Sequence, residues 1–286
     1  MTRFVSLNQF VNLWECDEND HMNVQFYFAK FQDAAQLFAM CHKLDDQLGP
    51  LINRHVRYHC ELRGGAQIQI TSSVIVAFGD LIAPGEGCFI QHVMRETTTG
   101  RIAATALDWH RGSLPPLSDA LCDEANTAVM PRGLKDPADL TPRQPPQEDG
   151  LIIARGILHP GLCDGDMLAR DQAYISAVSD AASHAWERVG LDVKWLESQG
   201  FGRMAVEMRL HILSPMKVGT AYQMQLGYTG LQARALTKRY DFFDMRDGAH
   251  LAILEAAVML LNHTTRKSEP LPDFTRAKVA TMLGAS

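Results

Sequence analysis

The sequence predicts an α+β protein that contains two tandem copies of one unit, each with a long helix against an antiparallel β-sheet. Three observations support this prediction: an internal repeat, a proline-rich segment between the two copies, and a helical apolar pattern followed by strand-like alternation in each copy. We take the repeat first, then the linker and the elements of each copy.

The repeat is clearest at the start of each predicted helix. A shift of 147 residues places "CDENDHMNVQFYFAKFQDAAQLFA", from Cys16, on "CDGDMLARDQAYISAVSDAASHAW", from Cys163, without a gap. Both copies also finish a late apolar run on a histidine. Coincidence between two amphipathic helices is the alternative, but the shared order of elements favours duplication. The identical pairs are Cys16/Cys163, Asp17/Asp164, Gln25/Gln172, Tyr27/Tyr174, Asp33/Asp180, Ala34/Ala181 and Ala35/Ala182.

A proline-rich segment separates the copies. Residues 130–150, "MPRGLKDPADLTPRQPPQEDG", contain five prolines, each of which fixes φ and lacks a backbone donor. We therefore expect an N-terminal domain at 1–115, a linker at 116–150 and a C-terminal domain at 151–286. A linker of this length suggests that the second unit takes the place of a symmetry mate, so that the two pack as a pseudo-dimer.

Within each copy a helix precedes several strands. Apolar residues recur at helical spacing from Tyr27 to Cys41 and from Tyr174 to Ala185. Tight turns such as "TTTG" and "MRDG" indicate antiparallel pairing. Strand-like alternation is seen in "AQIQITSSVIVAF", "CFIQHVMRE" and "RIAATALDWHR" of the first copy, and in "MAVEMRLHIL", "AYQMQLGYTG" and "ARALTKRYDFFDM" of the second.

Composition restricts the function classes. Hydrophobic residues make up 46% and charged residues 21%, which is typical of a soluble globular protein. A net charge of −6 argues against a general nucleic-acid binder. The most apolar run, "LAILEAAVMLL", is too short to span a membrane and carries Glu255, so we expect a cytoplasmic protein. Six scattered cysteines are expected to be free thiols, and without CxxC or HExxH motifs we expect no metal.

A polar cluster precedes the first helix: Asp17, Asn19, Asp20, His21 and Asn23. One interpretation is structural, because such residues cap helix starts and close loops. The other is catalytic, because the unsatisfied N–H groups of a helix start stabilise an oxyanion while a nearby carboxylate activates water or attacks directly. The residues alone leave both interpretations open.

The stretch "DENDHMNV" resembles a pattern of the hotdog-fold thioesterases. The double arrangement of a helix wrapped by a sheet is similar to two tandem hotdog domains, and the motif is similar to D-x-N-G-H-M-N-V in the branch that includes 4-hydroxybenzoyl-CoA thioesterase and bacterial acyl-CoA thioesterases. Asp20 stands where glycine is usual. The matching residues are Asp17, Asn19, His21, Met22, Asn23, Val24 and Tyr27.

This resemblance implies a thioesterase that hydrolyses an acyl-CoA or acyl-carrier-protein thioester without a cofactor. Asp17 is then the nucleophile or the general base, while His21 and Asn23 orient the thioester or the water. Substrate contacts are expected at Met22, Val24 and Tyr27, with N–H groups of residues 22–24 as the oxyanion site. The acyl group itself is not specified.

The second copy lacks most of the cluster, since Leu168 and Arg170 replace His21 and Asn23. Asp164 and Asp166 are therefore interpreted as capping or vestigial residues. Serines of the second helix are candidate wall residues of the substrate site: Ser176, Ser179 and Ser183. Basic residues of the second copy either meet coenzyme A phosphates or line solvated strand faces: Arg203, Arg209, Lys217, Arg234, Lys238 and Arg239.

Two other functions stay open. A non-catalytic hotdog module would bind an acyl group or a protein partner, and a hotdog hydratase or dehydratase would act on an enoyl-CoA. The D-x-x-x-H spacing from Asp17 to His21 fits the thioesterase motif better than the hydratase. Further homodimerisation of the double-hotdog chain is also an open expectation.

Overall fold

The computed structural model describes residues 4–75, 87–112, 114, 122–123, 127–136, 138–145 and 152–284. The chain divides into two compact units, Met1–Pro137 and Ala138–Ser286. This division falls inside residues 116–150, the segment predicted to be a linker. Each unit is described by itself.

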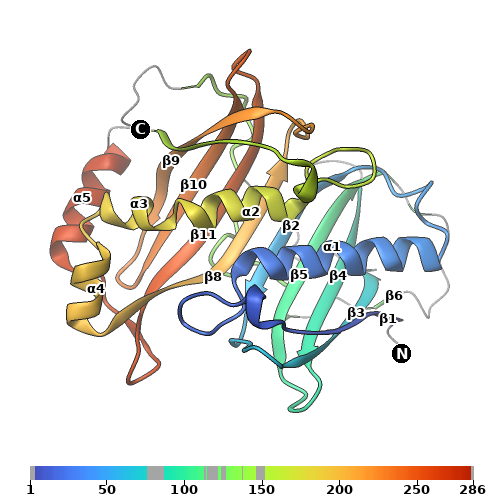
Figure 1. The fold of residues 1–286 in the computed structure, drawn as a ribbon, viewed down its shortest axis with the longest axis horizontal. Coiled ribbons are helices and arrows are strands. Elements are labelled where there is room, and N and C mark those ends of the chain that lie inside the picture. The colour runs from blue at the N-terminus through green and yellow to red at the C-terminus, as the bar shows by residue number, and fades with distance from the viewer. Residues whose placement is uncertain are drawn as a thin grey trace. The chain divides into compact units, whose positions relative to one another are not determined.

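The first unit is an antiparallel sheet with one long helix across it (Figure 1). The sheet has the strand order β1-β3-β4-β5-β2, and a short strand β6 pairs in parallel with β3. The elements are β1 (Phe4–Phe10), the 3-10 helix η1 (Leu13–Glu15), α1 (Val24–Cys41), β2 (Leu51–Tyr58), β3 (Gln67–Ile75), β4 (Gly87–Glu96), β5 (Ile102–Arg111) and β6 (Cys122–Asp123).

The second unit repeats this plan. Its sheet has the order β7-β9-β10-β11-β8, with β12 paired to β11, so corresponding strands occupy corresponding places in the two sheets. The duplication inferred from sequence is thereby confirmed. The elements are β7 (Ile152–Ile157), η4 (Pro160–Leu162), α2 (Asp171–Asp180), α3 (Ala182–Glu187), α4 (Val193–Gln199), β8 (Phe201–Ile212), β9 (Ala221–Leu231), β10 (Ala235–Asp244), β11 (His250–Asn262), β12 (Ser268–Glu269) and α5 (Asp273–Gly284).

The helix of the second unit is not continuous, unlike the one expected from residues 174–185. It breaks at Ala181, whose φ of −90° and ψ of 0° lie off the helical values. Ser176, Ser179 and Ser183 compete with the helix for backbone hydrogen bonds, whereas α1 has alanine at 29 and glutamine at 32 and 36, the corresponding places. The first helix therefore runs unbroken for 18 residues.

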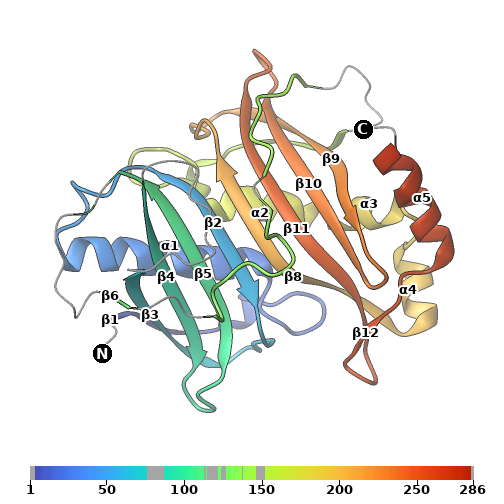
Figure 2. The same cartoon turned by 180° about the vertical axis from the view of Figure 1, so that it is seen from behind.

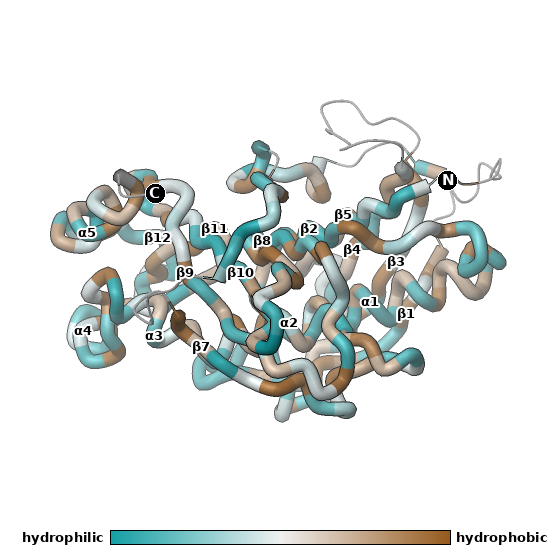
Figure 3. The backbone as a smooth tube through the Cα atoms, turned by 90° about the horizontal axis from the view of Figure 1, so that it is seen from above, coloured by the Kyte–Doolittle hydropathy of each residue, from teal (hydrophilic) through white to brown (hydrophobic). Residues whose placement is uncertain are grey.

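The core of the first unit lies between α1 and the sheet. Phe38 of α1 packs with Val74 and Ile90 of the strands, and Ala34 is fully buried on the same stripe. In Figure 3 brown, hydrophobic segments lie among the strands of the first unit, and β5 is buried without a break from Ala103 to Trp109. Strands buried on both faces need a second cover in addition to the helix.

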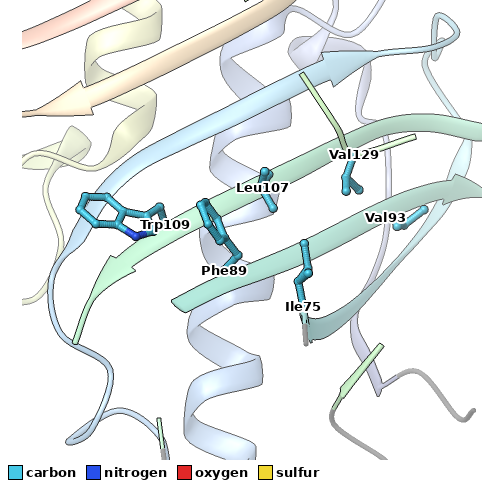
Figure 4. Packing of buried hydrophobic residues seen from close by; sticks show 6 residues of the cluster. All are labelled: Ile75, Phe89, Val93, Leu107, Trp109 and Val129. Carbon is cyan, nitrogen blue, oxygen red and sulfur yellow. The ribbon is translucent and has the colours of Figure 1, made fainter. Parts of the chain in front are cut away.

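Part of the predicted linker supplies that cover. Val129 packs with Ile75, Phe89, Val93, Leu107 and Trp109 on the face away from α1 (Figure 4). The Arg57 side chain donates to the carbonyls of Ala128 and Met130, at 3.0 and 2.8 Å. In the second unit the Asp139 carbonyl accepts from Arg239. Figure 2 shows this segment, in light green, in front of the strands and on the side away from the helices. Residues 127–136 and 138–145 thus contain residues that contact the strands of the two units.

Other sequence expectations also meet the structure. Both predicted turns join adjacent antiparallel strands, "TTTG" between β4 and β5 and "MRDG" between β10 and β11. The end of the predicted strand "AQIQITSSVIVAF" lies outside the described residues. All six cysteines are free, as expected. Within the described residues, none of the helices has the length and apolarity needed to cross a membrane.

Candidate active site

Asp17 closes the loop that leads into α1. Its N–H donates to the His21 carbonyl at 2.8 Å, and its Oδ1 accepts from the N–H groups of Asn19 and His21, at 2.9 and 3.3 Å. Asp20 within the loop has a φ of 60°, in the left-handed region. That backbone angle explains why related motifs carry glycine there, and why aspartate, which tolerates this region, is a workable replacement.

The second unit has the same loop. The Asp164 N–H donates to Leu168 O at 2.8 Å, and Asp164 Oδ1 accepts from the N–H groups of Asp166 and Leu168, both at 3.0 Å. Met167 takes the left-handed position, again with a φ of 60°. Asp164 therefore has a loop-closing role, and Asp17 shares that role.

Asp17 uses only one carboxylate oxygen in this way. Both side-chain hydrogen bonds go to Oδ1, and among the described residues no hydrogen bond to Oδ2 is found. The side chain is half-buried. One oxygen thus holds the loop, while the described residues provide no hydrogen bond for the other.

The start of α1 offers one backbone donor. Asn23 is the N-cap, and its Oδ1 accepts from Gln25 N–H at 3.1 Å, so the capping interpretation is correct for this residue. The Met22 and Asn23 N–H groups donate to backbone carbonyls, each at 2.8 Å. Of the three predicted oxyanion donors, the N–H groups of residues 22–24, only that of Val24 has no acceptor among the described residues. It lies at the positive end of the helix.

His21 lies beside an acid that the sequence did not single out. Its Nε2 is 3.3 Å from Glu61 Oε2, and its side chain is 14% exposed. Glu61 follows β2 in the sequence, and α1 lies between it and the motif. No sequence pattern around Glu61 indicates a role in the site. A carboxylate at this distance orients the imidazole ring of His21 toward itself.

A buried ion pair fixes η1 and α1 against each other. Lys30 Nζ lies 2.9 Å from Glu15 Oε1, and both side chains are at most 10% exposed. Glu15 Oε2 also accepts from the Asn12 N–H at 2.8 Å. Glu15 and Lys30 have Leu162 and Ala177 as their counterparts after the 147-residue shift. The pair therefore belongs to the first unit alone, and sequence reasoning missed it.

The expected substrate contacts differ in accessibility. Met22 and Tyr27 are each 4% exposed, whereas Val24 is half-buried. The Tyr27 ring packs edge-on against Tyr58, with centroids 5.1 Å apart. Burial raises the pKa of Tyr27, and the Leu62 backbone bonds its hydroxyl. These contacts explain the burial of Tyr27, and contact of Met22, Val24 and Tyr27 with substrate stays a prediction.

The candidate wall serines lie on the helices of the second unit. Ser176 and Ser179 of α2 are half-buried, and the exposed Ser183 of α3 accepts from Arg203 Nη1 at 3.0 Å. Their contact with substrate stays a prediction.

Two of the proposed basic residues are paired instead. Arg209 lies 2.7 Å from Glu255, and Arg239 lies 2.7 Å from Asp241, with all four side chains at most 10% exposed. These arginines therefore lie neither on a solvated strand face nor at a surface that phosphates reach.

Comparisons with known proteins give one family match, in the second unit. Residues 158–279 match the model of the thioesterase-like superfamily. The match covers the second unit and does not include the Asp17–Asn23 loop. A search of curated proteins found no match.

Two solved structures resemble nearly the whole chain. The 12:0-ACP thioesterase from Umbellularia californica has a TM-score of 0.62 at 10% identity, over 89% of this chain and 93% of that one. An acyl-ACP thioesterase from Bacteroides thetaiotaomicron has a TM-score of 0.60 at 11% identity, over 89% and 96%. At such identity the likeness concerns the fold.

The predicted fold class is thereby confirmed: the chain is a double-hotdog protein. Residues 158–279 of its C-terminal unit are similar to the thioesterase-like superfamily, in agreement with the resemblance of the first unit's motif.

Proposed function

We propose that this protein hydrolyses an acyl thioester to a free acid and a thiol. The superfamily match and the double-hotdog fold support this reaction class. One observation carries the assignment of the site. A single loop of the first unit combines a half-buried imidazole with a carboxylate oxygen and the Val24 N–H at a helix start, neither of which has a hydrogen-bond partner in the described part of the chain.

The chemistry follows from these three groups. Asp17 Oδ2 attacks the thioester carbon, or removes a proton from a water that attacks it. The Val24 N–H stabilises the oxyanion that forms on the carbonyl oxygen. The C–S bond then breaks, and the thiolate leaves and takes a proton. Where Asp17 itself attacks, a water molecule then hydrolyses the anhydride formed on Asp17, which releases the free acid and regenerates the carboxylate. His21, oriented by Glu61, positions the thioester or the water. The reaction requires no cofactor.

The substrate is an acyl-CoA or an acyl-carrier-protein thioester, which places the activity among the thioester hydrolases of class EC 3.1.2. The structural relatives are named for carrier-protein thioesters, and the motif resembles acyl-CoA thioesterases. Thiol release from a panel of acyl-CoAs and acyl-carrier-protein thioesters tests the proposal. Steady release above the buffer rate is expected, whereas no release from any substrate of the panel contradicts it.

A second candidate is a non-catalytic acyl-binding module. The observation in its favour is that Asp164 makes the same hydrogen bonds as Asp17, so loop closure alone explains an aspartate at this position. Under this alternative the protein binds acyl-CoA tightly in equilibrium dialysis and releases no thiol.

A further inference from the structure

A second candidate site lies in the first unit, away from the helix-start loop. A pocket of about 320 Å³ is lined by the C-terminal half of α1, the segment after it and the strands below. The first lining residue on α1, Gln32, lies eight residues after Val24, or about 12 Å along the helix axis. The apolar residues that line the pocket are Ala35, Ala39, Met40, Leu48, Leu51 and Ile90.

His110 is one of the residues that line this pocket, and its ring carries a hydrogen-bond acceptor. Its Nδ1 lies 3.0 Å from Gly49 O, and because a carbonyl only accepts, Nδ1 carries the hydrogen. Burial lowers the pKa of His110, which favours the neutral ring. Nε2 is then a bare acceptor. It is buried, and the described residues provide it with no hydrogen-bond partner.

The surrounding backbone fixes this orientation. A Cβ added to Gly49 would lie 1.7 Å from the Arg111 carbonyl oxygen, so only glycine lets the segment pass this close to β5. That approach brings the Gly49 carbonyl onto the imidazole. Packing therefore fixes the roles of the two ring nitrogens of His110: Nδ1 donates to the Gly49 carbonyl, and Nε2 has no partner among the described residues.

The charges around the pocket do not favour an anion. Arg54 lines the floor, but its Nε lies 2.7 Å from Asp108 Oδ1, and both side chains are at most 1% exposed. The ion pair cancels the arginine charge. Asp45, at the solvent side, adds a negative charge that repels carboxylates and phosphates. A neutral ligand that donates a hydrogen bond fits these features.

We propose that this pocket binds a neutral, mostly apolar group that carries one hydroxyl, and that the hydroxyl donates to His110 Nε2. Since a water molecule takes about 30 Å³ of liquid, the pocket has room for on the order of ten non-hydrogen atoms. The group is either the hydroxylated end of an acyl chain or a separate alcohol or phenol. Only the first of these sources rests on the proposed thioesterase function.

Titration calorimetry with 4-propylphenol and its methyl ether tests the hydroxyl contact. The phenol is expected to bind about 5-fold tighter than the ether, the factor for one net hydrogen bond. His110→Phe removes the acceptor and should abolish this difference. His59→Phe, which changes a histidine just after β2 and outside the pocket lining, should retain it. Equal binding of phenol and ether to the wild type, or an unchanged preference in His110→Phe, overturns the proposal.

The folded state of each variant is checked by its melting temperature. If His110→Phe is too unstable to measure, Ile90→Phe fills the pocket from a neighbouring strand and should weaken phenol and ether alike. Retained phenol binding with a filled pocket also overturns the proposal.

Hydrolysis then identifies the source of the hydroxyl. A preference for 12-hydroxydodecanoyl-CoA over dodecanoyl-CoA that is lost in His110→Phe assigns the pocket to the acyl chain. Equal rates, with selective phenol binding intact, assign it to a separate ligand. If no thioester is hydrolysed, the proposed function fails, and the calorimetry still decides this inference by itself.

Discussion

At the scale of single residues, the carboxylate of Asp17 serves two purposes. Oδ1 accepts two backbone hydrogen bonds that close the loop, and Oδ2 makes none among the described residues. The polar cluster was predictable as either a cap or a catalytic site, and the structure shows that Asn23 caps while Asp17 closes the loop. The contribution of Glu61 was not predictable, because the approach of His21 depends on tertiary packing across α1.

A buried ion pair gives a residue-scale prediction about acid stability. Burial opposes ionisation of Asp108, but the Arg54 guanidinium outweighs it and holds the pKa of Asp108 well below its usual range. A lowered pKa stabilises the fold fully above the unfolded value, near 4, and this contribution is lost as the pH falls toward the folded value.

Asp108→Asn tests this contribution. The substitution leaves Arg54 buried without its charge partner, which should cost about 3–5 kcal/mol at neutral pH. The free energy of unfolding, measured by urea denaturation from pH 6 to pH 2.5, should then fall less steeply with acid in the variant. Parallel curves for the two proteins would show that Asp108 does not contribute to the acid dependence.

At the scale of elements, the helices and central strands followed from the sequence better than the edges. Phenylalanines at helical spacing marked α1, and alternation marked β3 to β5. The strand β2 was missed because "LINRHVRY" carries two arginines and a histidine, of which Arg54 and His55 are buried. Charged residues inside a strand look like a surface segment until the partner, here Asp108, is known. The strands β1 and β7 and the helices α4 and α5 were also missed.

The Glu15–Lys30 pair that joins η1 to α1 gives an element-scale prediction. Lys30→Ala should destabilise the protein by about 3–5 kcal/mol, because Glu15 stays buried without its charge partner. Adding Glu15→Leu reproduces the apolar Leu162 and Ala177 found at the corresponding places of the second unit. The double variant should recover most of the lost free energy of unfolding in urea.

The free energies of unfolding of the single and the double variant together decide whether the ion pair stabilises the contact of η1 with α1. A double variant as unstable as Lys30→Ala would show that the instability does not come from the unpaired charge of Glu15. A single variant with wild-type stability would show that the ion pair contributes nothing.

At the scale of the whole molecule, one fold carries two unequal loops. The matching strand orders show the duplication that the repeat predicted, and only the first loop keeps the imidazole. The role of the linker was not predictable from its prolines. Its contacts depend on the apolar second face of β4 and β5, which is recognised only when both strands are placed in the sheet. The pseudo-dimer packing and further homodimerisation stay predictions.

Two truncations test the contribution of the linker to the first unit. Residues 1–115 lack Val129 and the carbonyls that Arg57 binds, so the face with Phe89 and Trp109 is left uncovered. This fragment should aggregate or self-associate in size-exclusion chromatography. Residues 1–137 restore the cover and should show less self-association and a higher melting temperature. Equal behaviour of the two fragments would contradict the covering role.

The central claim is that the loop of the first unit hydrolyses a thioester, and thiol release by three proteins tests it most directly: wild type, Asp17→Asn and Asp164→Asn. Asparagine keeps the Oδ1 acceptor at both positions, so melting temperatures should change little in either variant. Turnover should fall by at least about 10²-fold in Asp17→Asn, the usual lower scale for loss of a positioned acid or base, and stay near wild type in Asp164→Asn. Near-wild-type turnover in a folded Asp17→Asn protein, or its loss in Asp164→Asn alone, would contradict the account.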